Sequence, residues 1–247
     1  MCGGVVPDLL ERSLGRHRLV SETARTVIAI DGPAASGKSS TAQWVAERLG
    51  FRHVDSGSLY RGLTAAMLRT NVPANGWTPQ GLVAQGGRIA LRPERTSFTV
   101  LIDGEPSEEE FRGTRVTEHV SIVARIPQAR AWVNQRVREA AAEHDVVVDG
   151  RDMGTAVFPD APLKVFLIAD PWERARRRLV QRLGRRPTDS EIAEETDQIV
   201  QRDSRDATQT VQAADAVLLD TTYLTQEEQV ERIVALARAV THRPHDT

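Results

Sequence analysis

The feature that most constrains the fold is a glycine-rich octapeptide near the start of the chain. It reads Gly32-Pro33-Ala34-Ala35-Ser36-Gly37-Lys38-Ser39. The apolar run Val27–Ile30, which has the length and branching of a buried strand, comes just before it, and a helical pattern over Lys38–Leu49 overlaps its end. A strand, glycines at this spacing with Lys and Ser, and then a helix predict a phosphate-binding loop, or P-loop.

The chemistry of this loop indicates a nucleoside triphosphate. Glycine lets backbone N–H groups approach phosphate oxygens closely, and a helix N-terminus favours negative charge. We expect Lys38 to be exposed to the β- and γ-phosphates, and Ser39, followed by Ser40, to offer its hydroxyl to Mg²⁺. Asp149 ends the apolar run Val146–Val148 and is a second candidate Mg²⁺ ligand, although an Asp at a strand end can equally cap a turn.

Strand and helix patterns alternate along the chain from the P-loop region onward. The strand candidates are short and apolar, as in sheets covered on both faces: Val27–Ile30, Phe51–Val54, Val146–Val148, Leu163–Ala169 and Ala216–Leu219. The helix candidates are Lys38–Leu49, Ser58–Thr70, Gln128–Glu143, Pro171–Leu183 and Thr225–Val240. We therefore predict an α/β fold, a doubly wound parallel sheet of five strands with helices on both faces.

Two segments fall outside this alternation. Residues 1–25 carry glycines and mixed charge, and we expect a poorly ordered extension in which only Leu9–Leu14 has a helical pattern. Residues 71–120 contain two alternating runs, Arg88–Arg92 and Ser97–Ile102, which predict an antiparallel hairpin. We interpret 71–120 as a small insertion that covers a substrate, within one domain spanning 26–247.

The composition restricts the partners and the compartment. The formal net charge is −2, so no overall field attracts nucleic acid or a membrane surface. Cys2 is the only cysteine, which fits a reducing compartment. No run approaches the roughly 18 apolar residues of a membrane span. We expect a cytoplasmic monomer that binds small molecules, with no nucleic acid and no membrane as partner.

Two further loops combine Arg with small polar residues at predicted strand ends. The first is Asp55-Ser56-Gly57-Ser58-Leu59-Tyr60-Arg61, and the second is Asp149-Gly150-Arg151-Asp152-Met153-Gly154-Thr155. Ligands of open α/β sheets bind at the carboxyl ends of the strands. Arg carries a planar fork that matches phosphate oxygens, although a single Arg is more often in a surface ion pair. Two such loops beside a P-loop favour a second phosphate site.

At these residues the chain resembles bacterial cytidylate kinases, which belong to the nucleoside monophosphate kinases. The resemblance is carried by Ile30-Asp31-Gly32-Pro33, by Asp55-Ser56-Gly57 with Tyr60-Arg61, and by the loop beginning at Asp149 with the following Val157–Pro162. It extends from about Val27 to Val240. It implies that 71–120 is an enlarged insertion for binding the nucleoside monophosphate, and that 174–206 is a helical lid rich in Arg.

The resemblance also implies roles for individual residues. In this reading Ser56, Arg61 and Arg151 bind the CMP phosphate, Ser121, Arg130 and Asp152 contact cytosine, and Arg202 and Asp206 contact the ribose. Lys38, Arg151 and Arg202 would be the catalytic cations. An Asp acceptor with Arg and Ser donors matches the pairing edge of cytosine. The chain departs from the family after Asp206, where Gln209 stands in place of an expected Arg and the next loop is shorter.

These features together predict transfer of the γ-phosphoryl group of Mg·ATP to CMP or dCMP. Positioning and charge neutralisation would carry the rate, without a covalent intermediate and without an identified general base. Two alternatives stay open at this point. One is a P-loop kinase of another small acceptor, such as UMP, dTMP or shikimate. The other is a nucleotide-binding module without catalytic activity.

Overall fold

The computed structural model describes residues 25–241. The predicted helix over Leu9–Leu14 and nearly all of the predicted extension over 1–25 lie outside the described residues. Within 25–241 no helix is long and apolar enough to cross a membrane.

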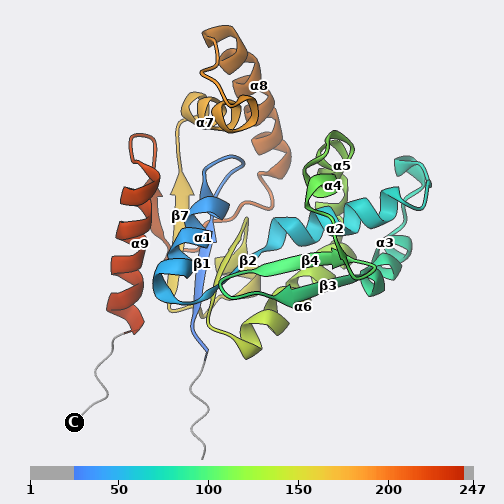
Figure 1. Ribbon diagram of the computed structural model, residues 1–247, viewed down its shortest axis with the longest axis horizontal. Coiled ribbons are helices and arrows are strands. Elements are labelled where there is room, and N and C mark those ends of the chain that lie inside the picture. The colour runs from blue at the N-terminus through green and yellow to red at the C-terminus, as the bar shows by residue number, and fades with distance from the viewer. Residues whose placement is uncertain (1–24, 242–247) are drawn as a thin grey trace, which may run out of the picture.

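A parallel sheet of five strands forms the centre of the described chain, in the order β2-β6-β1-β7-β8 (Figure 1). Its strands are β1 Val27–Asp31, β2 Arg52–Asp55, β6 Val146–Gly150, β7 Leu163–Ile168 and β8 Val217–Asp220. All neighbouring strands are parallel. Because β1 is central and the chain passes from it to both sides, a crevice opens at the carboxyl ends of β1, β6 and β2, where ligands of such sheets bind.

Both faces of the sheet are covered, as predicted, because alternate residues of each strand point to opposite faces. In β1, Val27 and Ala29 belong to one buried cluster, whereas Ile28 and Ile30 belong to the other. The helices that complete these clusters are α2 Ser56–Leu68 and α6 Pro127–Glu143 on the first face, and α1 Lys38–Leu49 and α9 Gln226–Thr241 on the second. The runs of apolar residues in the sequence therefore reflect burial on two sides.

The insertion contains the predicted hairpin and several helices that were not predicted. The hairpin consists of β3 Ile89–Pro93 and β4 Phe98–Ile102, and a short third strand, β5 Glu105–Pro106, pairs with β4. The additional helices are α3 Pro79–Gln85, α4 Glu108–Arg112 and α5 Thr114–Ala124, with 3₁₀ turns at Ala74–Gly76 and Gly86–Arg88. They are short and pack mainly on α2 and α6, and helices of this length are marginally stable without such packing.

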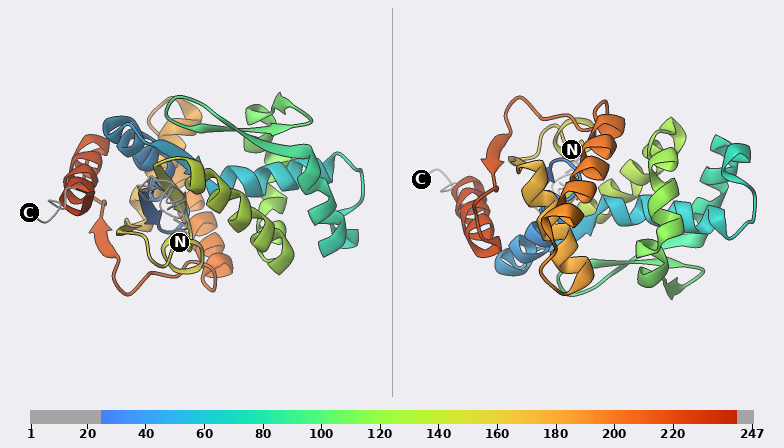
Figure 2. Two further views of the ribbon diagram at one scale, coloured as in Figure 1. Left: turned by 90° about the horizontal axis from the view of Figure 1, so that it is seen from below. Right: turned by 90° about the horizontal axis from the view of Figure 1, so that it is seen from above.

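Two helices lie above the carboxyl edge of the sheet in the segment predicted to be a lid, α7 Pro171–Leu183 and α8 Asp189–Asp206, and this pair is called the lid below (Figures 1 and 2). They pack on each other around a small cluster of their own, made by Ala175, Leu179, Ile192 and Ile199. The lid therefore has an apolar core separate from that of the sheet, and a segment of this kind can move as a unit.

Candidate active site

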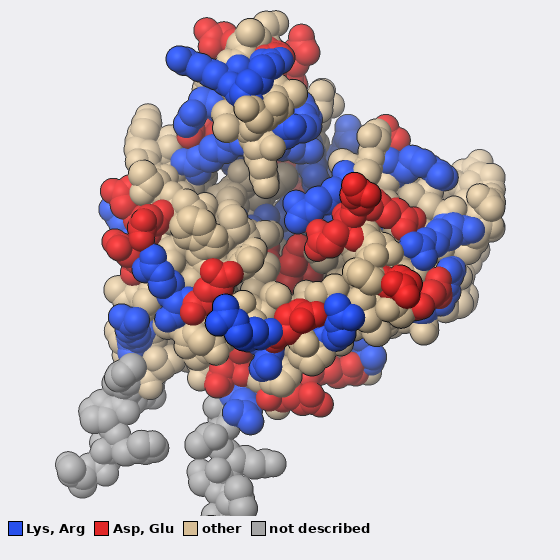
Figure 3. All heavy atoms as spheres, viewed as in Figure 1, with Lys and Arg blue, Asp and Glu red and all other residues tan. Residues whose placement is uncertain are grey.

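A cavity of about 1530 Å³ lies at the carboxyl edge of the sheet, between the P-loop, the insertion and the lid. Figure 3 shows it as a hollow below the lid, with Lys and Arg side chains gathered on the lid side. Typical pockets for one small ligand measure roughly 300–1000 Å³. The cavity is therefore large enough for two ligands.

The P-loop joins β1 to α1 at the floor of this cavity. Gly37 has φ 86°, a conformation that glycine adopts without strain, and it stands immediately before the first residue of α1. Gly32 is required for a different reason, since a Cβ atom there would lie 2.4 Å from the backbone oxygen of Leu167. The loop thus turns sharply against β7 and directs its backbone N–H groups at the N-terminus of α1 toward the cavity.

Lys38 is buried, contrary to the expectation that it is exposed to the phosphates. Its side chain is folded back, and Nζ donates to the carbonyl oxygen of Pro33 at 3.0 Å. Burial, followed by the nearby Arg151 charge, lowers the pKa of Lys38 to about 7. Because Lys38 still lines the cavity, an arriving phosphate could replace the Pro33 carbonyl as partner of the ammonium group.

Ser39 and Asp149 meet at the floor of the cavity, as predicted for two candidate metal ligands. The Ser39 hydroxyl donates to Asp149 Oδ2 at 2.6 Å. The other carboxylate oxygen, Oδ1, lies 2.7 Å from Nε2 of His53, a buried residue of β2 that the sequence analysis did not single out. A hydroxyl and a carboxylate are oxygen ligands of the kind that Mg²⁺ prefers, so the pair fits this ion.

His53 shows how strongly this carboxylate acts on its surroundings. Burial alone opposes a positive charge on the imidazole, but the hydrogen bond to Asp149 and the charge of that carboxylate raise the pKa of His53 above its usual value. No sequence motif pointed to His53, because contact between β2 and β6 depends on the order of the strands. The structure adds it to the floor of the site.

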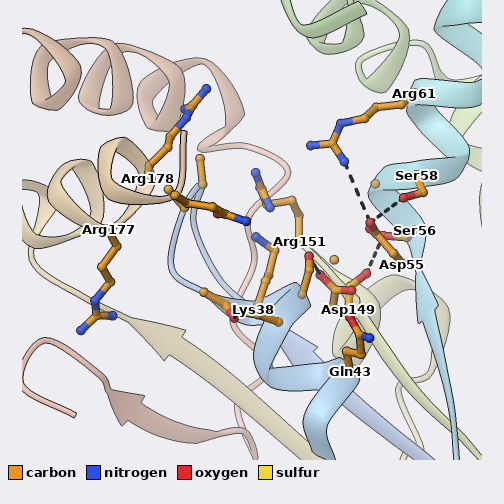
Figure 4. A pocket seen from close by; sticks show the side chains of 18 of the residues that line it. Lys38, Gln43, Asp55, Ser56, Ser58, Arg61, Asp149, Arg151, Arg177 and Arg178 are labelled. Atoms are coloured by element: carbon orange, nitrogen blue, oxygen red, sulfur yellow. Dashed lines mark hydrogen bonds and ion pairs between the residues drawn. The ribbon is translucent and has the colours of Figure 1, made fainter. Parts of the chain in front are cut away.

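The three predicted ligands of the acceptor phosphate line the cavity, two from α2 and one from the segment after β6 (Figure 4). Ser56 begins α2, and its hydroxyl donates to the backbone oxygen of Asp149 at 2.7 Å. Arg61, one turn further along α2, has Nη1 4.0 Å from Asp55 Oδ2. Arg151 follows β6, and its nearest carboxylate is Asp206, at 3.7 Å. Both guanidinium groups are held loosely enough to bind a phosphate.

The three residues predicted to contact the base also line one cavity wall: Ser121 on α5, Arg130 on α6 and Asp152 after β6. Arg130 Nη2 donates to Asp152 Oδ2 in a short ion pair. Burial raises the pKa of Asp152, although the Arg130 charge and hydrogen bond oppose this rise. Asp152 is thus paired with Arg130. The nearest carboxylate to Arg151 is that of Asp206, although the Arg151 charge also favours the ionised form of Asp152.

Asp31 supports this wall from below and was not assigned a role from the sequence. Its two carboxylate oxygens accept hydrogen bonds from the backbone N–H groups of Met153 and Gly154, each at 2.8 Å. These bonds fix the start of a short π-helical turn, Met153–Val157, directly after Asp152. Burial raises the pKa of Asp31 to about 6, although the two backbone bonds lower it.

Arg202 and Asp206, the predicted ribose contacts, lie one turn apart on α8 with Arg202 Nε 3.7 Å from Asp206 Oδ2. Asp206 therefore stands between Arg151 and Arg202. Burial, followed by the charge of Arg151, lowers the pKa of Arg202 to about 10. Gln209, the residue at which the chain departs from the family pattern, also lines the cavity. Its backbone N–H donates to the backbone carbonyl oxygen of Asp206 at 2.9 Å.

Most of the other lid arginines have carboxylate partners on the two lid helices. The pairs are Arg174–Asp203, Arg176–Glu173, Arg177–Glu173, Arg178–Glu195, Arg182–Glu195 and Arg185–Glu191. Arg176, Arg177, Arg178 and Arg182 still border the cavity. Arg174 differs from the rest, because it is almost completely buried at the base of the lid.

Comparison with known proteins identifies the family. The family model described as cytidylate kinase matches residues 28–239. The chain belongs to the cytidylate kinase family. A cytidylate kinase of Limosilactobacillus fermentum is 40% identical over 210 residues, which are 83% of this chain and 92% of that protein. One from Caldanaerobacter subterraneus is 40% identical over 85% of this chain and 94% of its own length.

A third relative, the cytidylate kinase of Geobacillus kaustophilus, is 41% identical over 217 residues, covering 86% of this chain and 96% of that protein. The match to the cytidylate kinase family includes the P-loop, the insertion and the lid. The family predicted from the sequence is thereby confirmed.

Proposed function

We propose that this chain transfers the γ-phosphoryl group of ATP to CMP, and to dCMP, giving ADP and CDP or dCDP. The observation that carries the proposal is that two polar sites line one cavity. P-loop residues form part of its lining, and so do Arg61, Arg151 and the Arg130–Asp152 pair with Ser121. Membership of the cytidylate kinase family supports the same reaction.

The donor site uses the P-loop backbone from Gly32 to Ser40 and the Lys38 ammonium group to hold the triphosphate. Ser39 and Asp149 would bind Mg²⁺, which would neutralise charge on the phosphate oxygens. When Lys38 exchanges the Pro33 carbonyl for phosphate oxygens, its pKa rises again, because an adjacent anion favours the charged form. Lys38 therefore delivers a full positive charge where the donor phosphates bind.

The acceptor site orients CMP for in-line attack by its phosphate oxygen. Ser56, Arg61 and Arg151 would hold the phosphate, and Asp206 with Arg202 would hold the ribose. Asp152 would accept a hydrogen bond from the cytosine amino group, while Arg130 and Ser121 would donate to the ring nitrogen and carbonyl. Arg151, Arg202 and Lys38 together surround the transferred group with cations, and charge neutralisation of this kind is the main source of rate in phosphoryl transfer.

The chain would act as a monomer in the cytoplasm, with small molecules as its only partners. Kinases of UMP, dTMP or shikimate remain the nearest rival activities, but membership of the cytidylate kinase family does not favour them. A nucleotide-binding module without activity would bind ATP and release no ADP when CMP is added.

The test is an ADP-release assay coupled to a spectrophotometric readout, with CMP, dCMP, UMP, dTMP and shikimate as acceptors. We expect CMP and dCMP to be the best acceptors and Lys38→Ala to lose on the order of 10³-fold in kcat. Circular dichroism of Lys38→Ala serves as the folding control. A higher kcat/KM with another acceptor, or activity of Lys38→Ala within tenfold of the wild type, would contradict the proposal.

A further inference from the structure

At the base of the lid, two side chains form hydrogen bonds with the backbone of one P-loop residue, Ala34, one with its carbonyl oxygen and one with its N–H group. Nη1 of Arg174, on α7, donates to the carbonyl oxygen of Ala34 at 2.7 Å. Oδ1 of Asp203, on α8, accepts from the Ala34 N–H group at 3.2 Å. Arg174 and Asp203 also pair with each other at 2.7 Å. The pair therefore closes a ring through Ala34 and ties both lid helices to the P-loop.

The contacts of Arg174 leave it little freedom. Its side chain is only 5% exposed, and Nε donates to the backbone oxygen of Ala169, between β7 and α7, at 3.1 Å. A guanidinium group buried this deeply needs a carboxylate partner and full hydrogen bonding to offset its loss of hydration. Asp203 supplies the charge, and the carbonyl groups of Ala34 and Ala169 supply the remaining acceptors.

The next P-loop residue, Ala35, is also held by the lid. Its φ is 57°, in the left-handed region that residues other than glycine rarely adopt. Its side chain packs against the lid's apolar cluster of Ala175, Leu179, Ile192 and Ile199. Figure 1 shows the P-loop, between β1 and α1, rising to the base of the lid. The conformation of the loop at residues 34 and 35 thus depends on contacts with the lid.

The position of Asp203 has an electrostatic consequence. Its carboxylate accepts a hydrogen bond from the backbone N–H group of Ala34. P-loops bind phosphate through backbone N–H donors of this type. An anion at this place would repel a triphosphate unless a cation compensates it. Arg174 compensates it at 2.7 Å, inside the protein, where screening by salt is weak.

We propose that Arg174 and Asp203 form a charge-neutral clamp that positions the P-loop for the donor triphosphate and couples the lid to it. Arg174 and Asp203 act as positioning residues, and neither needs to touch the nucleotide. The proposal rests only on that part of the proposed function in which the P-loop binds ATP. Direct binding of ATP in the wild-type protein therefore tests the proposed donor separately from the clamp.

The experiment measures the dissociation constant of ATP by calorimetry for Arg174→Met, Asp203→Asn and the double variant. Arg174→Met leaves the Asp203 charge uncompensated, so we expect ATP to bind about tenfold more weakly or worse. Asn at 203 can still accept from the Ala34 N–H group but carries no charge. We therefore expect Asp203→Asn to bind ATP as tightly as the wild type or more tightly, and the double variant to bind at least threefold more tightly than Arg174→Met.

The distinguishing result is weaker ATP binding in Arg174→Met without weaker binding in Asp203→Asn, because general disruption of the lid would weaken ATP binding in both. Arg88→Met and Asp103→Asn break an exposed pair at the base of the hairpin and should change ATP binding by less than twofold. Arg174→Met binding within twofold of the wild type, or Asp203→Asn binding more than threefold weaker, overturns the proposal.

Thermal unfolding of each variant shows whether it folds. If Arg174→Met does not fold, Asp203→Asn compared with the double variant still decides the question. The clamp then requires the double variant to bind ATP more weakly than Asp203→Asn, because only the latter keeps the Arg174 charge. Equal or tighter binding by the double variant contradicts the proposal.

Discussion

We propose that discrimination between acceptor bases rests on the Asp152 carboxylate. Cytosine offers its amino group to this acceptor, whereas uracil offers a carbonyl oxygen, whose lone pairs face those of the carboxylate. A buried charged acceptor left without its donor costs more than roughly 1–3 kcal/mol. We expect the wild-type enzyme to prefer CMP to UMP by on the order of 10²-fold in kcat/KM, and Asp152→Asn to narrow this ratio mainly by losing activity with CMP.

The measurement is kcat/KM for both nucleotides with both proteins. The Arg130–Asp152 pair offers a second comparison, because Arg130→Met removes the partner of Asp152 together with a proposed donor to the base and leaves the carboxylate itself in place. If Asp152 acts only by holding Arg130, both variants should lower the two activities by similar factors. An unchanged ratio of CMP to UMP activity in Asp152→Asn would remove Asp152 from base recognition.

Asp31 gives the enzyme a dependence of stability on pH. The unfolded chain releases this proton near pH 3.8, whereas burial keeps it bound up to a pKa of about 6 in the folded protein. Between these values the folded state binds more protons, so the free energy of unfolding falls as pH rises. The loss should reach about 3 kcal/mol once pH exceeds the folded pKa.

Denaturant unfolding of the wild type and Asp31→Asn from pH 3.5 to 7.5 checks this expectation. Asn does not titrate, so the difference in unfolding free energy between the two proteins should change across pH 4–6 in favour of the variant. A difference that is flat across this range would show that Asp31 does not carry the effect.

At the residue scale the sequence predicted those side chains that lie in one continuous motif. Lys38, Ser39 and Asp149 follow from the P-loop and from a strand that ends in Asp. His53, Arg174 and Asp203 could not be found in this way, because each gains its role from a partner far along the chain: Arg174 and Asp203 meet only when α7 and α8 pack. The burial of Lys38 was missed for a similar reason, since its partner is a backbone carbonyl.

At the scale of elements, the bounds of a helix were predicted correctly where capping residues next to it mark its start and its end. The bounds of α1 and α7 agree with the sequence because Gly50 and Gly184 end them in the left-handed conformation, and Asp170 caps the start of α7. The start of α2 was placed too late, at Ser58. Ser56 and Gly57 are weak helix formers, and they enter the helix because their loop is fixed against β6.

The lid helix α8 depends on a capping box at its N-terminus. The Thr188 hydroxyl accepts from the backbone N–H group of Glu191, and the Glu191 carboxylate accepts from that of Thr188 at 2.7 Å. We expect Thr188→Ala to lower the free energy of unfolding of the lid by about 1 kcal/mol, because an orphan N–H group loses its partner. Hydrogen exchange of α8 amides measures this change.

Thr188→Ser is the matched control, since serine keeps the hydroxyl and should preserve exchange protection. The sheet lies outside the lid's apolar cluster, so amides of β1 should exchange at the same rate in all three proteins. Equal protection of α8 in the Ala and wild-type proteins would mean that the ends of the lid are stabilised by packing alone.

At the scale of the whole molecule, the insertion was inferred from its break in the strand–helix alternation, whereas the lid was inferred from family resemblance. Propensity and periodicity predicted the sheet and the hairpin, because burial on two faces and strict alternation leave clear patterns in sequence. They did not predict α3, α4 and α5, which are short and gain their stability from α2 and α6. The cavity depends on how these parts pack together, so its shape was beyond sequence patterns.

The extent of the catalytic unit provides a prediction for the whole chain. The family model begins at residue 28, and the residues before the first strand lack the apolar periodicity that would dock them on the sheet. A protein lacking residues 1–24 should therefore keep kcat and KM for CMP within twofold of the full chain, and its melting temperature within a few degrees. A second truncation, ending before α9 at Thr225, is the opposite control. It removes Val230, Ile233 and Ala237 from the core on one face of the sheet, and it should not fold. A shortened chain without residues 1–24 that is folded but inactive would assign a catalytic or binding role to the N-terminal segment.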